Sequence, residues 1–220
     1  MGVQDFWFAA FAALVVGLGL WWSWKQARIR GEEYRAFAAE HGWTYIQKRD
    51  RGLARTHRAL DRLRVGSNRY GYDHAWGEWG GYPAESFNFH YQTGSGKSTH
   101  HHYLSVVMIR LEREFPELRI HPEGIFQKIG QAIGFQDIDF ESVEFSKRFE
   151  VKCRNKKFAY DFCHTRMMEY LLRHPETAIE LEGRVLVSYG RGNLRASELP
   201  ARLEALLEIR RLMPEYLFRD

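Results

Sequence analysis

The hydrophobic pattern divides the chain near its start, because residues 6–24 contain no charged side chain. Asp5 precedes this run and Lys25 follows it. As a helix, these 19 residues would span roughly 28 Å, close to the ~30 Å hydrocarbon core of a bilayer. Aromatic rings stand at both ends of the run, as is typical of segments that meet two headgroup layers. The pattern therefore predicts a membrane span over residues 6–24.

The charges beside this run predict its orientation. Lys25, Arg28 and Arg30 follow the run, whereas Asp5 is the only charged side chain before it. The positive-inside rule then places the N-terminus outside and the rest of the chain in the cytoplasm. A cleaved signal peptide is disfavoured, because no Lys or Arg precedes the run and tryptophans stand where a cleavage site needs small residues. The residues expected at the membrane interface are Trp7, Trp21, Trp22, Trp24, Lys25, Arg28 and Arg30.

After the run, the apolar period is first helical and then alternating. Tyr34, Phe37, Ala38 and His41 recur at helical spacing and predict a helix over residues 27–41, which Gly42 terminates. A short strand over residues 43–46 follows. Residues 25–47 thus form a juxtamembrane helix and a first strand, and residues 48–220 form the cytoplasmic domain.

Alternation with a period of two predicts an antiparallel sheet from Arg69 onward. Phe87, Phe89 and Tyr91 alternate with polar residues in one strand, and its partner covers residues 70–76. Further strands are expected over residues 102–111, 118–121 and 143–153. A hairpin is expected over residues 178–189, turning at Glu182-Gly183.

Three helices are expected within this domain. Pro122 and Gly134 bracket the first. The second covers residues 165–173. The third begins near Ser197 and ends at Pro214, with one apolar face formed by Leu199, Leu203, Leu206 and Met213.

These elements predict an α+β fold: an N-terminal transmembrane helix, then an antiparallel sheet with two internal helices and a C-terminal amphipathic helix. About seven strands followed by a helix also fit a pleckstrin-homology-like barrel with helical insertions. The chain has no long Pro/Gly/Ser linker and no repeat, so a single domain is expected after the span.

Net charge is mild, but its distribution is uneven. Lys and Arg number 32 against 28 Asp and Glu, which gives +4 and does not favour nucleic acid as a partner. Residues 48–69 hold eight basic residues against Asp50 and Asp61. This segment favours contact with anionic lipid next to the span; the alternative is a solvated basic face that pairs with acids of the fold. The residues assigned to lipid contact are Arg51, Arg55, Arg58 and Arg62.

Thr93–Thr99 (Thr-Gly-Ser-Gly-Lys-Ser-Thr) imitates the end of a phosphate-binding loop. The full motif needs a glycine where Tyr91 stands and a helix after the loop. Three histidines and then a strand pattern follow instead, which predicts a hairpin loop. No nucleotide is expected to bind the Gly94–Thr99 stretch.

Histidines 100–102 could supply imidazole ligands to a metal ion, and His90 is expected to face His101 across the hairpin. Adjacent strand residues point to opposite faces, so the three cannot all converge, and no metal or cofactor is expected. Cys163 and His164 are neighbours, which rarely gives a nucleophile–base pair. Cys153 and Cys163 are both expected to be reduced.

Asp137, Asp139 and Glu141 share one face if this stretch is extended. A calcium loop would need glycine where Ser142 stands, so an acidic strand edge is expected. Paired carboxylates here would be the catalytic groups if the protein were a hydrolase.

Several short motifs carry a resemblance to a known family. They are Gly77-Glu78-Trp79, Phe87, Pro122-Glu123-Gly124, Asp137-Ile138, Glu141-Ser142, Glu144-Phe145, Phe149, Val151, Phe158-Ala159 and Met167-Met168. With them the chain resembles a family of uncharacterised, mainly actinobacterial proteins that carry a membrane span or two before one soluble domain. The resemblance covers roughly residues 35–215. It implies a bacterial plasma membrane and a cytoplasmic domain, and it implies no reaction.

The sequence therefore favours a single-pass membrane protein whose cytoplasmic domain binds another protein or the lipid surface. No catalytic residues are assigned. The alternative is a membrane-anchored enzyme, for example a hydrolase that acts on envelope precursors through Asp137, Asp139 and Glu141.

Overall fold

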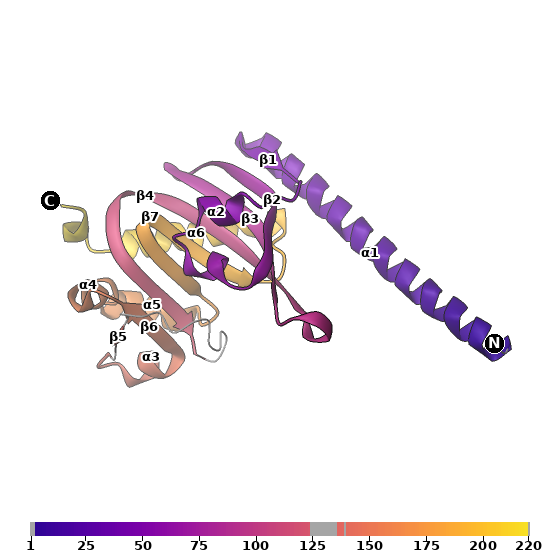
Figure 1. Cartoon of the computed structure of the whole chain (residues 1–220). Helices are drawn as coiled ribbons and strands as arrows, with labels where there is room; N and C mark the ends of the chain where they lie inside the picture. Colours follow the sequence, from indigo (N-terminus) through magenta and orange to yellow (C-terminus); the bar gives the residue numbers. More distant parts are fainter. Residues whose placement is uncertain (1–2, 124–135, 139, 220) are drawn as a thin grey trace.

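The computed structural model describes residues 3–123, 136–138 and 140–219 and confirms the α+β class (Figure 1). An N-terminal helix is followed by an antiparallel sheet, several small helices and a C-terminal helix. The helix expected between Pro122 and Gly134 lies largely outside the described residues.

The first helix, α1 (Val3–His41), is a single element of 39 residues. It joins the apolar run and the juxtamembrane helix without a break, and it projects from the body of the domain (Figure 1). Gly42 ends it with φ +70°, as expected of a glycine terminator. Among the described residues, no helix combines the length and the apolar character needed to cross a membrane. The helix is confirmed, and the span stays a prediction.

All strand pairs of the seven-stranded sheet are antiparallel, in the order β1-β2-β3-β4-β6-β5, with β7 paired to β4. Among the described strands no pairing closes the sheet, so a pleckstrin-like barrel is not seen in this part of the chain. Its strands are β1 (Thr44–Ile46), β2 (Ser67–Trp79), β3 (Tyr82–Thr93), β4 (His100–Pro122), β5 (Gln136–Asp137), β6 (Phe149–Cys153) and β7 (Ala178–Arg191).

Two predicted breaks do not exist. The strands expected over residues 102–111 and 118–121 are one strand, β4, and the hairpin expected around Glu182-Gly183 is one strand, β7. The two long strands pair with each other, and their register shifts on either side of the pair Phe115↔Gly183. Gly183 has φ +56°, so its left-handed conformation is absorbed by a bulge within the sheet and not by a turn.

One predicted strand begins as a helix. Residues 143–153 split into α3 (Val143–Arg148) and β6. Ser142 precedes α3 and its hydroxyl accepts a hydrogen bond from the Phe145 backbone N–H at 3.3 Å. This cap satisfies a backbone donor that a helix start would otherwise leave free, and so favours helix over strand.

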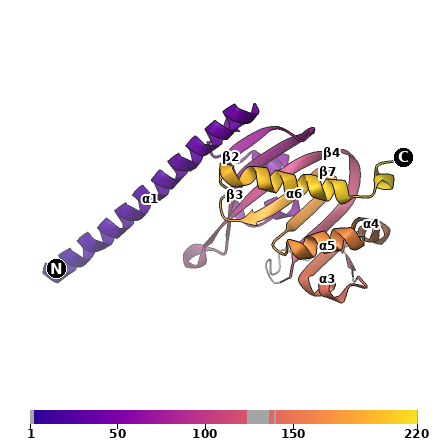
Figure 2. The same cartoon turned by 180° about the vertical axis from the view of Figure 1, so that it is seen from behind.

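The remaining helices are short, apart from the last. They are α2 (Leu53–Thr56), α4 (Lys156–Phe162), α5 (Thr165–Arg173) and α6 (Leu199–Leu212), with 3-10 turns η1 (Asp61–Arg64), η2 (Gly96–Ser98), η3 (Ala196–Glu198) and η4 (Glu215–Phe218). Helices α5 and α6 confirm the expected elements, and α6 lies across one face of the sheet (Figure 2).

The two faces of the sheet have separate apolar cores. The C-terminal half of α1 and helix α6 belong to the first core, through residues such as Tyr34, Phe37, Leu203 and Leu206. The segment from α2 to η1 covers the other face and buries Leu53, Leu60 and Leu63 against Phe87 and Phe89. The sheet is thus covered on both faces, and α1 enters one of the two cores.

Candidate functional site

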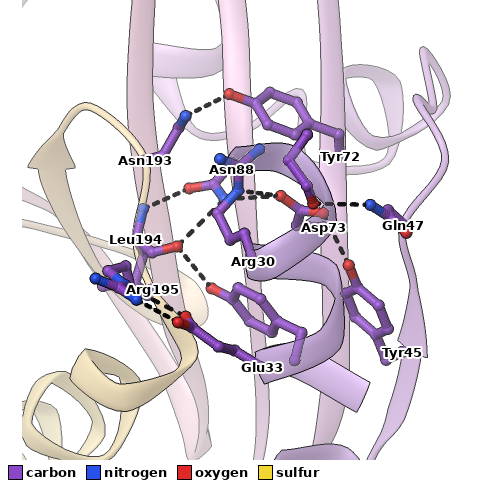
Figure 3. A network of polar contacts seen from close by, with 12 residues as sticks. Arg30, Glu33, Tyr45, Gln47, Tyr72, Asp73, Asn88, Asn193, Leu194 and Arg195 are labelled. Atoms are coloured by element: carbon purple, nitrogen blue, oxygen red, sulfur yellow. Dashed lines mark hydrogen bonds and ion pairs between the residues drawn. The ribbon is translucent and has the colours of Figure 1, made fainter. Parts of the chain in front are cut away.

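A buried polar network joins the C-terminal half of α1 to the sheet (Figure 3). Asp73 of β2 lies at its centre with 1% of its surface exposed. The Arg30 Nε donates to Asp73 Oδ2 at 2.7 Å, and the Tyr45 hydroxyl donates to Oδ1 at 2.8 Å. Asp73 has φ +50° beside a register shift between Tyr72 and Ala75, so the bulge aims its carboxylate at α1. The pair is a buried, charge-assisted contact between helix and sheet.

The same network reaches the chain before α6. The side chain of Asn88 accepts from the Leu194 N–H at 2.7 Å and its amide donates to Asp73 Oδ2 at 3.4 Å. The Tyr72 hydroxyl donates to the Asn193 side chain, and Arg195 forms an ion pair with Glu33 of α1. Residues 193–195, β2, β3 and α1 thus meet at one point (Figure 3).

Burial and the Asp73 charge set the protonation of the tyrosines here. Burial first, and the nearby Asp73 carboxylate second, raise the pKa of Tyr34 and Tyr45 far above the usual value. Both hydroxyls therefore keep their protons and act as donors, Tyr34 to the Leu194 carbonyl at 3.4 Å. The network consists of fixed donors and acceptors, which suits mechanical coupling and not proton transfer.

The side chain of Arg30, which the sequence predicts at the membrane interface, is turned into the domain instead. Its side chain is only 15% exposed, because it reaches back into the domain toward Asp73. Lys25 and Arg28 remain outside, over the rings of Trp21 and Trp24 at 5.1 and 5.8 Å. The charges that follow the apolar run therefore divide between an exposed pair and one structural residue.

A groove of about 680 Å³ opens on the face of the sheet that α2 covers. Glu85 lies in it, and its Oε1 accepts from His57 Nε2 at 2.9 Å and from His74 Nε2 at 2.8 Å. Burial alone would raise the pKa of Glu85, but the two histidine hydrogen bonds outweigh burial and lower it to about 2. Such a carboxylate is a fixed acceptor and not a proton donor near neutral pH. The groove is also lined by apolar side chains, among them Leu53, Leu60, Trp76, Met108 and Val185.

A second buried carboxylate lies under η1. Glu180 is 0% exposed; it accepts from the Asp61 N–H at 2.9 Å and from the Tyr189 hydroxyl at 2.8 Å. Burial raises the pKa of Glu180 to about 7, although these donors and Arg119 favour its charged form. Because Glu180 is fully buried, neither solvent nor a substrate reaches its carboxyl group. Its raised pKa therefore affects the stability of the fold and not a reaction.

The basic residues assigned to lipid contact do not form one surface. Arg51, Arg55 and Arg58 are exposed. Arg62 is 5% exposed and lies over the Tyr189 ring at 5.9 Å, so it is not available at the surface. Its place beside Arg55 and Arg58 is taken by Arg64 and Arg69, which the assignment omitted.

The loop that imitates a phosphate-binding motif is a hairpin tip, as predicted. Gly96–Ser98 forms a single 3-10 turn between β3 and β4, and a strand follows it. The three histidines that follow do not converge. His101 Nδ1 lies 3.0 Å from His90 Nε2, whereas His102 stacks on Tyr91 with ring centroids 4.7 Å apart. Within the described residues, no three His, Cys, Asp or Glu side chains are placed to hold a metal ion.

The acids of the enzyme alternative are only partly described. Asp139 lies outside the described residues, Asp137 belongs to the two-residue strand β5, and Glu141 is exposed just before α3. Cys153 and Cys163 are free and buried, and burial raises the pKa of both thiols. Neither cysteine has the exposure or the lowered pKa of a reactive thiol.

Comparisons with known proteins were made for sequence and for fold. No family model matches the sequence, and no curated protein does so significantly. Among solved structures, the mycobacterial trehalose monomycolate transport factor A, TtfA, is similar with a TM-score of 0.62. The two chains share a fold. Their sequences are 13% identical, and the likeness covers 84% of this chain and 96% of TtfA.

The residues at the centre of the two polar clusters were missed by the sequence analysis. Asp73 and Asn88 stand in alternating strands, where a polar residue normally faces solvent. The bulge after Tyr72 changes that alternation, and no residue type in the sequence marks it. His74 and Glu85 are brought together by the pairing of β2 with β3, and His57 reaches them from the end of α2.

Proposed function

We propose that this protein is a non-catalytic accessory factor of envelope-lipid transport. Residues 6–24 of α1 hold it at the bacterial plasma membrane, with the N-terminus outside and the sheet domain in the cytoplasm. The domain acts by binding a protein partner at the membrane.

The observation that carries this proposal is the division of α1. Its N-terminal part presents large apolar side chains to solvent, with Trp7 67% and Phe8 80% exposed. Its C-terminal part is fixed in the domain by Tyr34, Phe37 and the Arg30–Asp73 ion pair. A water-soluble domain rarely leaves so large an apolar surface uncovered, and lipid is the simplest cover for an uncharged helical run of this length.

The polar clusters and the shared fold support a non-catalytic role in transport. Two carboxylates at the centre of the polar clusters are not free to react: Glu85 is held by two histidines, and Glu180 is sealed from solvent. TtfA, which has the same fold, is a trehalose monomycolate transport factor. An accessory factor of this kind would serve the movement of a glycolipid of the envelope without changing its covalent structure.

Membrane attachment is tested by fractionating cells that produce the full chain. We expect the protein in the membrane fraction after alkaline carbonate treatment, with the domain digested only by protease added from the cytoplasmic side. A chain without residues 6–24 should be released. Release of the full chain by carbonate would contradict the attachment.

The transport role is tested by depleting the protein in its native host and following newly made envelope glycolipids by pulse labelling. We expect them to accumulate in the plasma membrane and to move outward again when the full chain is restored. A chain whose residues 6–24 are replaced by an unrelated span of equal length is the matched control and should also restore movement. Unchanged movement after depletion would overturn the role.

A further inference from the structure

Four arginines line one hollow on the outer side of the α2–η1 segment. The hollow has a volume of about 420 Å³ and is lined by Ala54, Arg55, Arg58, Arg64 and Arg69. The backbone beneath it is held by Leu53, Leu60 and Leu63, which are 5% exposed or less. The Arg69 guanidinium also donates to the Arg64 carbonyl at 2.5 Å, which ties the two sides of the hollow together. The arginines are thus carried on a fixed frame.

This hollow has an excess of positive charge. Among the described residues, Arg64 is the only one of the four with a carboxylate in ion-pair range, Asp61 at 3.8 Å. Asp61 is also held by Arg119 at 2.7 Å, so little of its charge is left for the hollow. Guanidinium groups present planar pairs of donors that match phosphate oxygens, and several of them around one small space favour an anion between them.

The hollow lies toward the end of the sheet that is nearest the apolar part of α1. Helix α1 runs in the same direction as β2: Phe37 stacks near Trp79 at the end of the strand, with ring centroids 6.2 Å apart, and Arg30 meets Asp73 in its middle. Following α1 toward its N-terminus therefore leads back to the start of β2, where Arg69 lies. Figure 1 shows the hairpin between β3 and β4 reaching out on this same side.

We propose that the hollow formed by Arg55, Arg58, Arg64 and Arg69 binds the phosphate of an anionic lipid headgroup. This inference rests on the proposed membrane attachment, because attachment through residues 6–24 brings the start of β2 toward the headgroup layer. The apolar segment would supply the affinity, and the arginine hollow would orient the sheet domain against the membrane surface.

The test uses the full chain reconstituted in nanodiscs of phosphatidylcholine alone or with phosphatidylglycerol. Hydrogen exchange of residues 53–69 should slow when phosphatidylglycerol is present, by about fivefold for each guanidinium that meets a headgroup charge. The slowing should disappear at about 0.5 M salt, where the screening length is only a few ångströms.

Two triple variants make the test specific. Arg55→Gln, Arg58→Gln and Arg69→Gln together should abolish the slowing. The control Lys157→Gln, Arg166→Gln and Arg173→Gln removes three charges from exposed positions on or next to α4 and α5 and should keep it. Equal exchange in both lipids, or equal slowing in both variants, would overturn the proposal.

The remaining outcomes separate the two proposals. Slowing by inorganic phosphate in pure phosphatidylcholine discs, with no added effect of phosphatidylglycerol, would assign the hollow to a free phosphate and overturn the lipid contact. Failure of the full chain to enter any disc would instead overturn the membrane attachment.

Discussion

At the scale of single residues, the contact that matters most is the ion pair of Arg30 and Asp73. Its two side chains are 15% and 2% exposed, so neither charge is fully compensated by water. We expect Asp73→Ala to lower the free energy of unfolding by about 3 to 5 kcal/mol, because it leaves Arg30 buried without its partner. Chemical denaturation of the domain measures this loss.

The double variant Arg30→Met with Asp73→Ala is the control for this prediction. It removes both charges and should be more stable than Asp73→Ala alone, because no uncompensated charge remains. The exposed pair Arg28–Glu32 offers a comparison, since Glu32→Ala should cost less than about 1 kcal/mol. Equal losses for Asp73→Ala and Glu32→Ala would show that the buried pair does not couple α1 to the sheet.

Glu180 should make stability depend on pH. Its pKa is about 7 in the folded protein and about 4.5 when exposed, so unfolding releases a proton between these values. The contribution of Glu180 to the free energy of unfolding should therefore be largest below pH ~4.5. It should fall by up to about 3 kcal/mol as the pH rises past 7.

The variant Glu180→Gln isolates this effect. It cannot ionise, so the difference in unfolding free energy between variant and parent should shift in favour of the variant as the pH rises from 4.5 to 8. The comparison is needed because His121, whose pKa is lowered to about 3 chiefly by burial, acts in the opposite direction and weakens the fold as the pH falls below its unfolded value. A difference that does not change with pH would contradict the role of Glu180.

At the scale of elements, the two parts of α1 should contribute very differently to folding. Residues 6–24 end before the contacts with the domain begin, whereas Tyr34 and Phe37 are 0% and 7% exposed within it. We expect the chain 25–220 to unfold cooperatively and the chain 42–220 to lose its fixed tertiary structure. Each of the two lost aromatic residues is worth about 3 to 5 kcal/mol.

Near-ultraviolet circular dichroism and thermal unfolding of both truncated chains check this prediction. A cooperative transition for the chain 42–220 would show that the sheet domain does not need α1. Loss of folding in the chain 25–220 would show that the apolar part also has a structural role.

The elements that could be predicted are those with a long, regular period. Helix α6 has one apolar face, and Phe87, Phe89 and Tyr91 of β3 follow one alternation, so both elements could be placed from the sequence. The prediction was wrong where strand pairing outweighed a local turn signal. At Gly183 a hairpin turn was predicted, but pairing with β4 keeps β7 continuous and leaves only a bulge. The prediction was also wrong at α3, where Val143 and Phe145 alternate like strand residues although Ser142 caps a helical turn.

At the scale of the whole molecule, composition along the chain predicted the long first helix and the basic segment but not how the surface is organised. The membrane span itself stays a prediction. The network at Asp73 combines residues distant in the chain, and the arginine hollow depends on how the segment from Ala54 to Arg69 folds back on itself. Arg62 shows the limit clearly, because the nearby arginines Arg58 and Arg64 are exposed while Arg62 is buried against Tyr189.

Helix α1 is continuous from its apolar N-terminal part to the part that packs against the sheet. A rotation of one part about the helix axis is therefore passed on to the other. One residue inserted after Lys25 would turn the domain by about 100° about the helix axis and advance it by about 1.5 Å. Seven inserted residues would nearly restore the rotation of the domain about the helix axis and lengthen the helix by about 10.5 Å. If the domain must face its partner from one side, the single insertion should abolish glycolipid movement in the depleted host. The seven-residue insertion should support glycolipid movement if the rotation of the domain matters more than its distance from the apolar segment.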